Sequence, residues 1–249
     1  MNIDLTGARA VVAGGSRGIG RAIALALAEA GAGVSICARG AEALAAARDD
    51  VARFGQTAHA ATCDLADAAA IPRYIDAAAT ALGGIDILVN NASAFGTSDD
   101  EAGWAGSIAV DLMATVRATR AALPHLEKSQ AGAILNISSI SGFRASARTP
   151  PYGAAKAAVL EYTQTCAAQL ARKSIRVNCI APGSIEFPGG TWERAKNHNP
   201  NLYGAILRSI PFGRLGRPEE VARVAVFLCS PLAGWVTGQN IAVDGGQML

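Results

Sequence analysis

ARAVVAGGSRGIG, residues 8–20, joins a short β-branched run to a turn that contains four glycines. The run 8–13 predicts a buried strand. Beyond the turn, Ile23, Leu27 and Ala30 recur at helical spacing and Gly31 suits a C-cap, so a helix is expected there. Glycines between a strand and a helix let backbone N–H groups approach a pyrophosphate, although a tight turn without a ligand uses them too.

The same alternation of strand and helix continues along the chain. Further strands are expected at 34–38, 57–62, 85–90, 132–138, 175–181 and 240–243. Further helices are expected at 41–54, 67–82, 101–128, 150–172 and 218–229. Without an internal repeat or a linker, this order predicts one α/β domain over 1–249, a doubly wound parallel sheet flanked by helices. The Pro-, Gly- and Asn-rich segment 184–214 has weak helical periodicity and is expected to be a mobile lid.

Composition excludes several classes of partner. The 249 residues are 51% hydrophobic with a net charge of +2, and no Lys/Arg run is present, which argues against nucleic-acid binding. We expect no signal peptide, because the first residues lack an apolar core, and no membrane span, because no uninterrupted apolar run is long enough. No two of the five cysteines have the C-x-x-C spacing, so we expect reduced thiols in a cytoplasmic protein. The three histidines are scattered along the chain, so we expect no metal site.

The stretch that ends at Lys156 carries groups suited to proton transfer. Tyr152 and Lys156 are four residues apart, so they share one face of the expected helix, and Ser139 lies at the end of the preceding strand. A nearby ammonium favours a phenolate, so the pKa of Tyr152 is expected below the free value of about 10. Ser139 would then bond a carbonyl oxygen. Each motif alone also arises by chance.

The end of the second strand bears on the choice of cofactor. An acid there would bond a ribose 2′-hydroxyl, but the chain has Arg39, and the glycine turn adds Arg17. Two cations favour a 2′-phosphate, and the less favoured alternative for either arginine alone is a solvated surface charge. Asp64, after the third strand, either borders the site or only caps a turn.

These motifs, in this order, resemble the short-chain dehydrogenase/reductase family over essentially the whole chain. The motifs are Gly14-x-x-x-Gly18-x-Gly20, Asn90-Asn91-Ala92, Ser139, Tyr152-x-x-x-Lys156, Pro182-Gly183 and Asp244-Gly245-Gly246. The resemblance implies a Rossmann fold of seven parallel strands, a nicotinamide cofactor and hydride exchange with a carbonyl or an alcohol. It also implies a homotetramer.

The resemblance implies a role for each matching residue. Tyr152 would be the general acid, Lys156 would tune its pKa and bind the nicotinamide ribose, and Ser139 would orient the carbonyl. The cofactor, NADP(H) by preference with NAD(H) possible, would contact the following residues: Gly14, Ser16, Arg17, Gly18, Ile19, Gly20, Arg39, Asp64, Leu65, Asn90, Asn91, Ala92, Tyr152, Lys156, Pro182, Gly183 and Ile185.

Four positions depart from the family pattern. Ala13 and Ser93 replace a Thr and a Gly, and Phe187 stands where a carboxamide-binding Thr is usual. Asp111 holds the position of a relay asparagine, twenty-eight residues before Ser139. We expect Asp111 to be catalytic and to lie near the Lys156 ammonium.

Three functions remain open on the sequence. The leading expectation is an NADPH-dependent reductase of a ketone or 3-oxoacyl carbonyl, with a tyrosine as acid. The second is an NAD(P)-dependent dehydrogenase of a sugar, polyol or cyclic secondary alcohol. The third is a non-catalytic nucleotide-binding regulatory protein, because fold alone does not establish activity.

Overall fold

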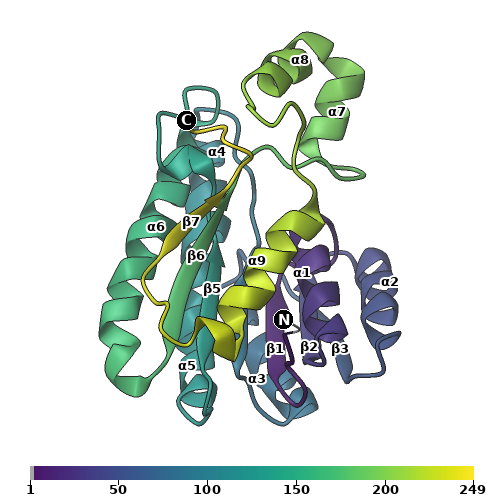
Figure 1. The fold of residues 1–249 in the computed structure, drawn as a ribbon, viewed down its shortest axis with the longest axis vertical. Coiled ribbons are helices and arrows are strands. Elements are labelled where there is room, and N and C mark those ends of the chain that lie inside the picture. The colour runs from purple at the N-terminus through teal and green to yellow at the C-terminus, as the bar shows by residue number, and fades with distance from the viewer. Residues whose placement is uncertain (1–2) are drawn as a thin grey trace.

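The computed structural model describes residues 3–249 and contains one parallel sheet of seven strands in the order β3-β2-β1-β4-β5-β6-β7 (Figure 1). The strands are β1 (Arg9–Ala13), β2 (Gly33–Ala38), β3 (Ala58–Thr62), β4 (Ile87–Asn90), β5 (Ala133–Ile137), β6 (Arg176–Pro182) and β7 (Asn240–Val243). The order reverses between β1 and β4, which is the doubly wound arrangement expected from the sequence.

Helices cover both faces of the sheet (Figure 1). They are α1 (Gly18–Glu29), α2 (Ala41–Ala52), α3 (Ala70–Leu82), α4 (Glu101–Gly106), α5 (Ala114–Leu126), α6 (Pro150–Leu170), α7 (Thr191–His198), α8 (Pro200–Arg208) and α9 (Pro218–Cys229). Short 3₁₀ turns stand at Ile140–Gly142 (η2), Ala171–Lys173 (η3) and Pro231–Ala233 (η4).

The alternating side chains of the strands build two cores. In β1, Val12 packs with α1, α2 and α9, whereas Val11 packs with α3, α5 and α6 on the opposite face. Both valines are fully buried. Because the central strands are buried on both faces and mostly apolar, their sequences are nearly continuous hydrophobic runs, as is typical of buried parallel strands.

The helix expected over 101–128 is interrupted. The segment η1 (Ser107–Met113) between α4 and α5 is a π-helix. The amphipathic pattern does not reveal this extra residue per turn, and π-helical turns are frequent at functional sites. Asp111, the replacement for the relay asparagine, lies inside η1 and is completely buried.

The segment expected to be an irregular lid contains two helices. Figure 1 shows α7 and α8 beyond the end of the sheet, apart from the helices that flank it. Asn199 caps α8 by accepting a hydrogen bond from the Leu202 amide at 3.2 Å, and Pro200 occupies its first turn. Cap and proline are the sequence signals that outweigh the weak periodicity.

Within residues 3–249, no helix is long and apolar enough to cross a membrane. All five cysteines are buried free thiols.

Candidate active site

The carboxyl ends of the central strands bring the expected site residues to one edge of the sheet. Gly14 follows β1, Asn91 follows β4, Ser139 comes two residues after β5, and Pro182 ends β6. These four strands are neighbours in the sheet and run in parallel. Ligands bind at this edge in doubly wound sheets.

The glycine turn is fastened to the end of β4. The side-chain amide of Asn91 donates a 2.8 Å hydrogen bond to the carbonyl of Gly14. Gly14 has φ +87°, and a Cβ there would lie 2.9 Å from the Cα of Ala92. A Cβ on Gly20 would lie 2.1 Å from the Gly14 carbonyl oxygen. The turn therefore requires glycine for backbone packing, whether or not a ligand is bound.

The start of α1 fits the pyrophosphate of a dinucleotide. Arg17 is the N-cap but makes no side-chain cap, and the first turn contains no acidic residue. Ser16 and Ile19 flank this position and are half-buried. Uncapped N–H groups and the positive end of the helix dipole attract phosphate.

The side chain of Asn90 turns away from the glycine turn. Its amide donates to the side-chain oxygens of Asn136 at 2.9 Å and Thr119 at 3.2 Å. Asn136 in turn donates to Thr163 on α6 at 2.9 Å. Only the backbone of Asn90 is therefore available to a cofactor. This hydrogen-bond network could not be predicted from the sequence, because an isolated polar residue in an apolar run does not show which residue it will bond.

The expected catalytic residues meet between β5 and α6. Lys156 is 2% exposed and donates to the Ile137 carbonyl at 2.9 Å. Its Nζ lies 5.6 Å from the ring centroid of Tyr152. The Ser139 hydroxyl oxygen accepts the Ser141 amide at 3.1 Å and lies close enough to Tyr152 to lower the pKa of its phenol. A donor hydroxyl, a phenol and an ammonium thus share one site.

The expected depression of the Tyr152 pKa is wrong for this structure. Burial raises the pKa of Tyr152 above its ordinary value, and the charge of Asp111 raises it further. The Lys156 ammonium and the hydrogen bond with Ser139 lower it, but by less. The phenol is therefore held protonated at neutral pH, which is the state a general acid requires.

Asp111 lies beside Lys156, as expected from the sequence. Its Oδ1 is 3.3 Å from the Lys156 Nζ, and its Oδ2 accepts the Ala94 amide at 3.2 Å. Oδ1 has no other hydrogen-bond partner among the described residues. The carboxylate thus connects the ammonium to the loop that follows β4.

The residues expected at the adenosine end lie at neighbouring strand ends. Arg39 follows β2 and Arg17 precedes α1; both are exposed, and neither forms an ion pair within residues 3–249. Asp64 follows β3, is exposed, and accepts the Ala66 amide at 3.0 Å. Leu65 is buried in the core. Asp64 therefore caps the turn that follows β3. The side chains of Arg17 and Arg39 remain available to an anion.

The segment after β6 is held by a residue that sequence reasoning missed. The buried side chain of Gln247 accepts the Ser184 amide at 2.9 Å and donates to the Ser184 hydroxyl at 3.1 Å. A Cβ on Gly183 would lie 2.8 Å from the Cα of Asp244. Ile185 is buried and forms an isolated bridge with Gly216, so only its backbone can meet a carboxamide.

Phe187 covers the start of α1. A Cβ on Gly18 would lie 2.7 Å from its ring. A cavity of about 630 Å³ adjoins this contact between α1, α8 and the start of α9, and it includes neither Ser139 nor Tyr152. Its lining includes Ser16, Arg17, Phe187, Tyr203 and Arg217. The cavity therefore lies beside the glycine turn, at the end of the site where the cofactor is expected.

Comparison with known proteins gives a family and full-length relatives. The family model described as Enoyl-(Acyl carrier protein) reductase matches residues 13–248. Isoepoxydon dehydrogenase of Penicillium expansum is 40% identical over 253 residues, which cover 99% of this chain and 96% of the relative. The 3-oxoacyl-(acyl-carrier-protein) reductase of Chlamydia pneumoniae is 36% identical over 252 residues, 99% of each chain.

A similar solved structure contains the expected cofactor. A short-chain dehydrogenase from Burkholderia cenocepacia, in complex with NADP, superposes with a TM-score of 0.91. It is 33% identical in sequence, and the alignment covers 98% of this chain and 99% of that one.

Proposed function

The chain belongs to the short-chain dehydrogenase/reductase family of NAD(P)-dependent oxidoreductases acting on alcohols and ketones, and we propose that it reduces a ketone to a secondary alcohol with NADPH. The observation that carries the proposal is the meeting of Ser139, Tyr152 and the buried Lys156–Asp111 pair at the end of β5. A buried ion pair beside a protonated phenol suits acid catalysis.

Each side chain has a distinct task in the proposed reaction. Ser139 donates a hydrogen bond to the carbonyl oxygen and so stabilises the charge that develops there. Tyr152 transfers its proton to that oxygen. Lys156, fixed by Ile137 and Asp111, stabilises the phenolate that remains. NADPH, when bound, supplies the hydride to the carbonyl carbon.

The cofactor preference rests on the ends of β1 and β2. Arg39 stands where an acid would bind the ribose of NAD, and Arg17 faces solvent at the start of α1. Two unpaired cations suit a 2′-phosphate. The NADP-bound structure from Burkholderia cenocepacia supports the same choice, and use of NAD(H) at lower affinity is compatible with it.

The experiment is a titration of the purified protein with NADPH and with NADH, followed by cofactor fluorescence, and an assay of ketone reduction with both. The proposal predicts tighter binding of NADPH and turnover with it. Arg17→Ala and Arg39→Ala should each weaken NADPH without weakening NADH. A preference for NADH would contradict the 2′-phosphate site, and binding without turnover of any ketone or alcohol would favour a non-catalytic nucleotide-binding protein.

A second candidate is oxidation of a sugar, polyol or cyclic secondary alcohol. The word dehydrogenase in the name of the relative at 40% identity favours oxidation, as the word reductase in the name of the 3-oxoacyl-(acyl-carrier-protein) reductase favours reduction. The two are distinguished by assaying both directions on the same panel of ketones and alcohols. A higher kcat/KM for alcohols at neutral pH would favour oxidation.

The proposal also covers the segment next to the site and the assembly of the protein. The segment 184–214, with α7 and α8, would act as a lid over bound substrate. The protein would act in the cytoplasm as a homotetramer on a small molecule. Light scattering of the purified protein tests the assembly, and protection of 184–214 from hydrogen exchange on adding NADPH tests the lid.

A further inference from the structure

The backbone of Phe95 is held in an unfavourable conformation. Its φ is +51°, and Ser174 is the one other non-glycine residue with positive φ in the described part of the chain. This left-handed conformation is sterically unfavourable for a residue with a Cβ, whereas glycine adopts it freely. Strain of this kind persists where surrounding contacts enforce it, and it marks sites where the side chain has a task.

Contacts on both sides of Phe95 enforce the conformation. The Phe95 amide donates to the Ser93 hydroxyl at 3.0 Å, and the Ala94 amide donates to Asp111 at 3.2 Å. At Gly96, a Cβ would lie 2.4 Å from the hydroxyl oxygen of Ser107, which opens the π-helix. The loop is therefore fixed against η1, and Ser93 and Asp111, two departures from the family pattern, supply its hydrogen bonds.

The aromatic ring of Phe95 lies against the proposed proton donor. Its centroid is 4.9 Å from that of Tyr152, and the two rings meet edge to face at 65°. Phe95 is nevertheless 38% exposed. One part of the ring thus supports Tyr152, and the remainder faces solvent beside it. A molecule whose carbonyl accepts the Tyr152 proton would lie beside Tyr152, the side chain that the Phe95 ring contacts.

We propose that Phe95 is a specificity-determining residue that favours a ketone carried on a flat ring over a ketone in a flexible chain. A flat ring presents a face or an edge to Phe95 and forms an aromatic contact of the kind that Tyr152 already makes. A flexible chain loses rotamer freedom when it packs on the same surface, so it gains less. The inference rests on the proposed function, in which Tyr152 is the proton donor.

The test compares two ketones, acetophenone, whose carbonyl is carried on an aromatic ring, and ethyl acetoacetate for the chain. We expect Phe95→Ala to lower kcat/KM for acetophenone by about three- to tenfold more than for ethyl acetoacetate, the size of one aromatic contact. The affinity for NADPH should stay unchanged, because Phe95 is not among the residues expected to contact the cofactor. Phe95→Gly should give the same loss of discrimination while removing the strained φ, so a folding defect does not explain it.

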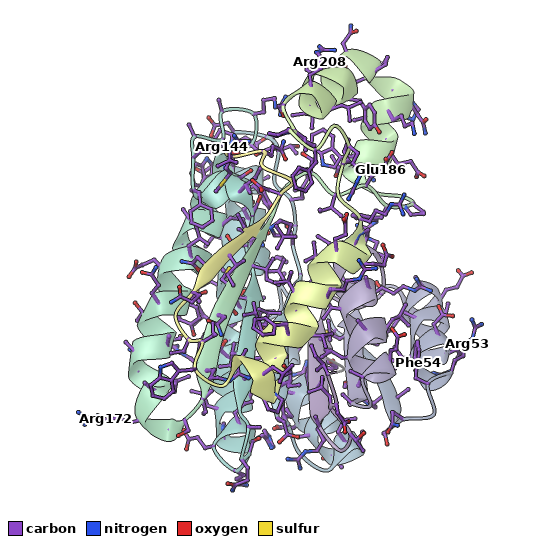
Figure 2. All side chains as sticks on the ribbon, viewed as in Figure 1. Arg53, Phe54, Arg144, Arg172, Glu186 and Arg208 are labelled. Carbon is purple, nitrogen blue, oxygen red and sulfur yellow. The ribbon has the colours of Figure 1, made fainter. Side chains whose placement is uncertain are left out.

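The matched control is Phe54→Ala. Phe54 is 41% exposed, against 38% for Phe95, but lies at the end of α2, far from the upper edge of the sheet (Figure 2). This variant should leave the ratio of the two kcat/KM values unchanged.

The outcomes separate this inference from the proposed function. Equal losses on both ketones in Phe95→Ala would overturn the inference alone, since the ring would then serve only to support Tyr152. An unchanged ratio in both Phe95 variants would overturn it as well. A parent protein that turns over neither ketone, nor their alcohols, with either cofactor would overturn the proposed function and the inference together.

Discussion

The carboxylate of Asp111 lies 3.3 Å from the ammonium of Lys156, and both residues are at most 2% exposed. Asp111 comes from the π-helix η1 and Lys156 from α6, so the pair joins two elements at the site. Taking two charges out of water is costly, and such a pair persists when each charge compensates the other. Its position beside Tyr152 couples the pair to the proposed chemistry.

Asp111→Asn should shift the pH profile of ketone reduction. The charge of Asp111 raises the pKa of Tyr152, so its removal lowers that pKa. Reduction needs protonated Tyr152 and is lost as pH rises through the pKa. The decline of kcat/KM at alkaline pH should therefore begin at a lower pH in the variant, measured with NADPH and one ketone. An unchanged activity and pH profile would show that the charge has no catalytic part.

Lys156→Ala should destabilise the protein and abolish turnover. The variant leaves the Asp111 carboxylate buried without its cation, which costs about 3–5 kcal/mol. Urea unfolding measures this loss. The double variant Lys156→Ala/Asp111→Ala removes both charges and should recover part of the stability but none of the activity. A double variant no more stable than Lys156→Ala would contradict a compensating pair.

Gly14→Ala should weaken NADPH binding. The new Cβ would lie 2.9 Å from the Cα of Ala92, and φ is +87°. Gly55→Ala is a matched control, since φ there is +78° and no atom lies within 4 Å. We expect Gly55→Ala to cost about 1 kcal/mol in the free energy of unfolding with unchanged NADPH affinity. A change in affinity of similar size in both variants would refute the specific role of the turn.

Gln247→Ala should loosen both ends of the segment that carries α7 and α8. Gln247 bonds Ser184 at the start of this segment and Ser209, 3.4 Å away, near its end. Its carbonyl also accepts Arg144, which lies at the upper end of the molecule on the α6 side (Figure 2). The buried Ser184 amide would lose its partner, at a cost of about 1–3 kcal/mol. Limited proteolysis within 186–214 should accelerate.

The exposed Gln56 provides the control for that experiment, and Gln56→Ala should leave the rate of proteolysis unchanged. Equal rates in the parent and in Gln247→Ala would mean that the C-terminal residues do not hold the segment.

Elements whose sequence signals are local could be predicted from the sequence. The glycines of the first turn, the apolar strands and the Tyr152–Lys156 spacing each follow from a short stretch, and the structure confirms their positions. The neighbourhood of Asp111 and Lys156 followed from the resemblance and is also confirmed.

What the sequence did not reveal depends on contacts between distant segments. The π-helix holds the buried Asp111, whose partner Lys156 lies on the distant α6. Gln247 contacts Ser184 only once β7 lies beside β6. The pKa of Tyr152 depends on burial, which the four-residue spacing to Lys156 does not show. The start of α8 depends on a cap and a proline rather than on periodicity.

The most direct test of the proposed function is Tyr152→Phe, assayed for ketone reduction and titrated with NADPH in parallel. The variant lacks only the hydroxyl that we propose as the proton donor. We predict turnover reduced to background with NADPH affinity retained. Turnover close to that of the parent would contradict Tyr152 as the acid and with it the proposed mechanism.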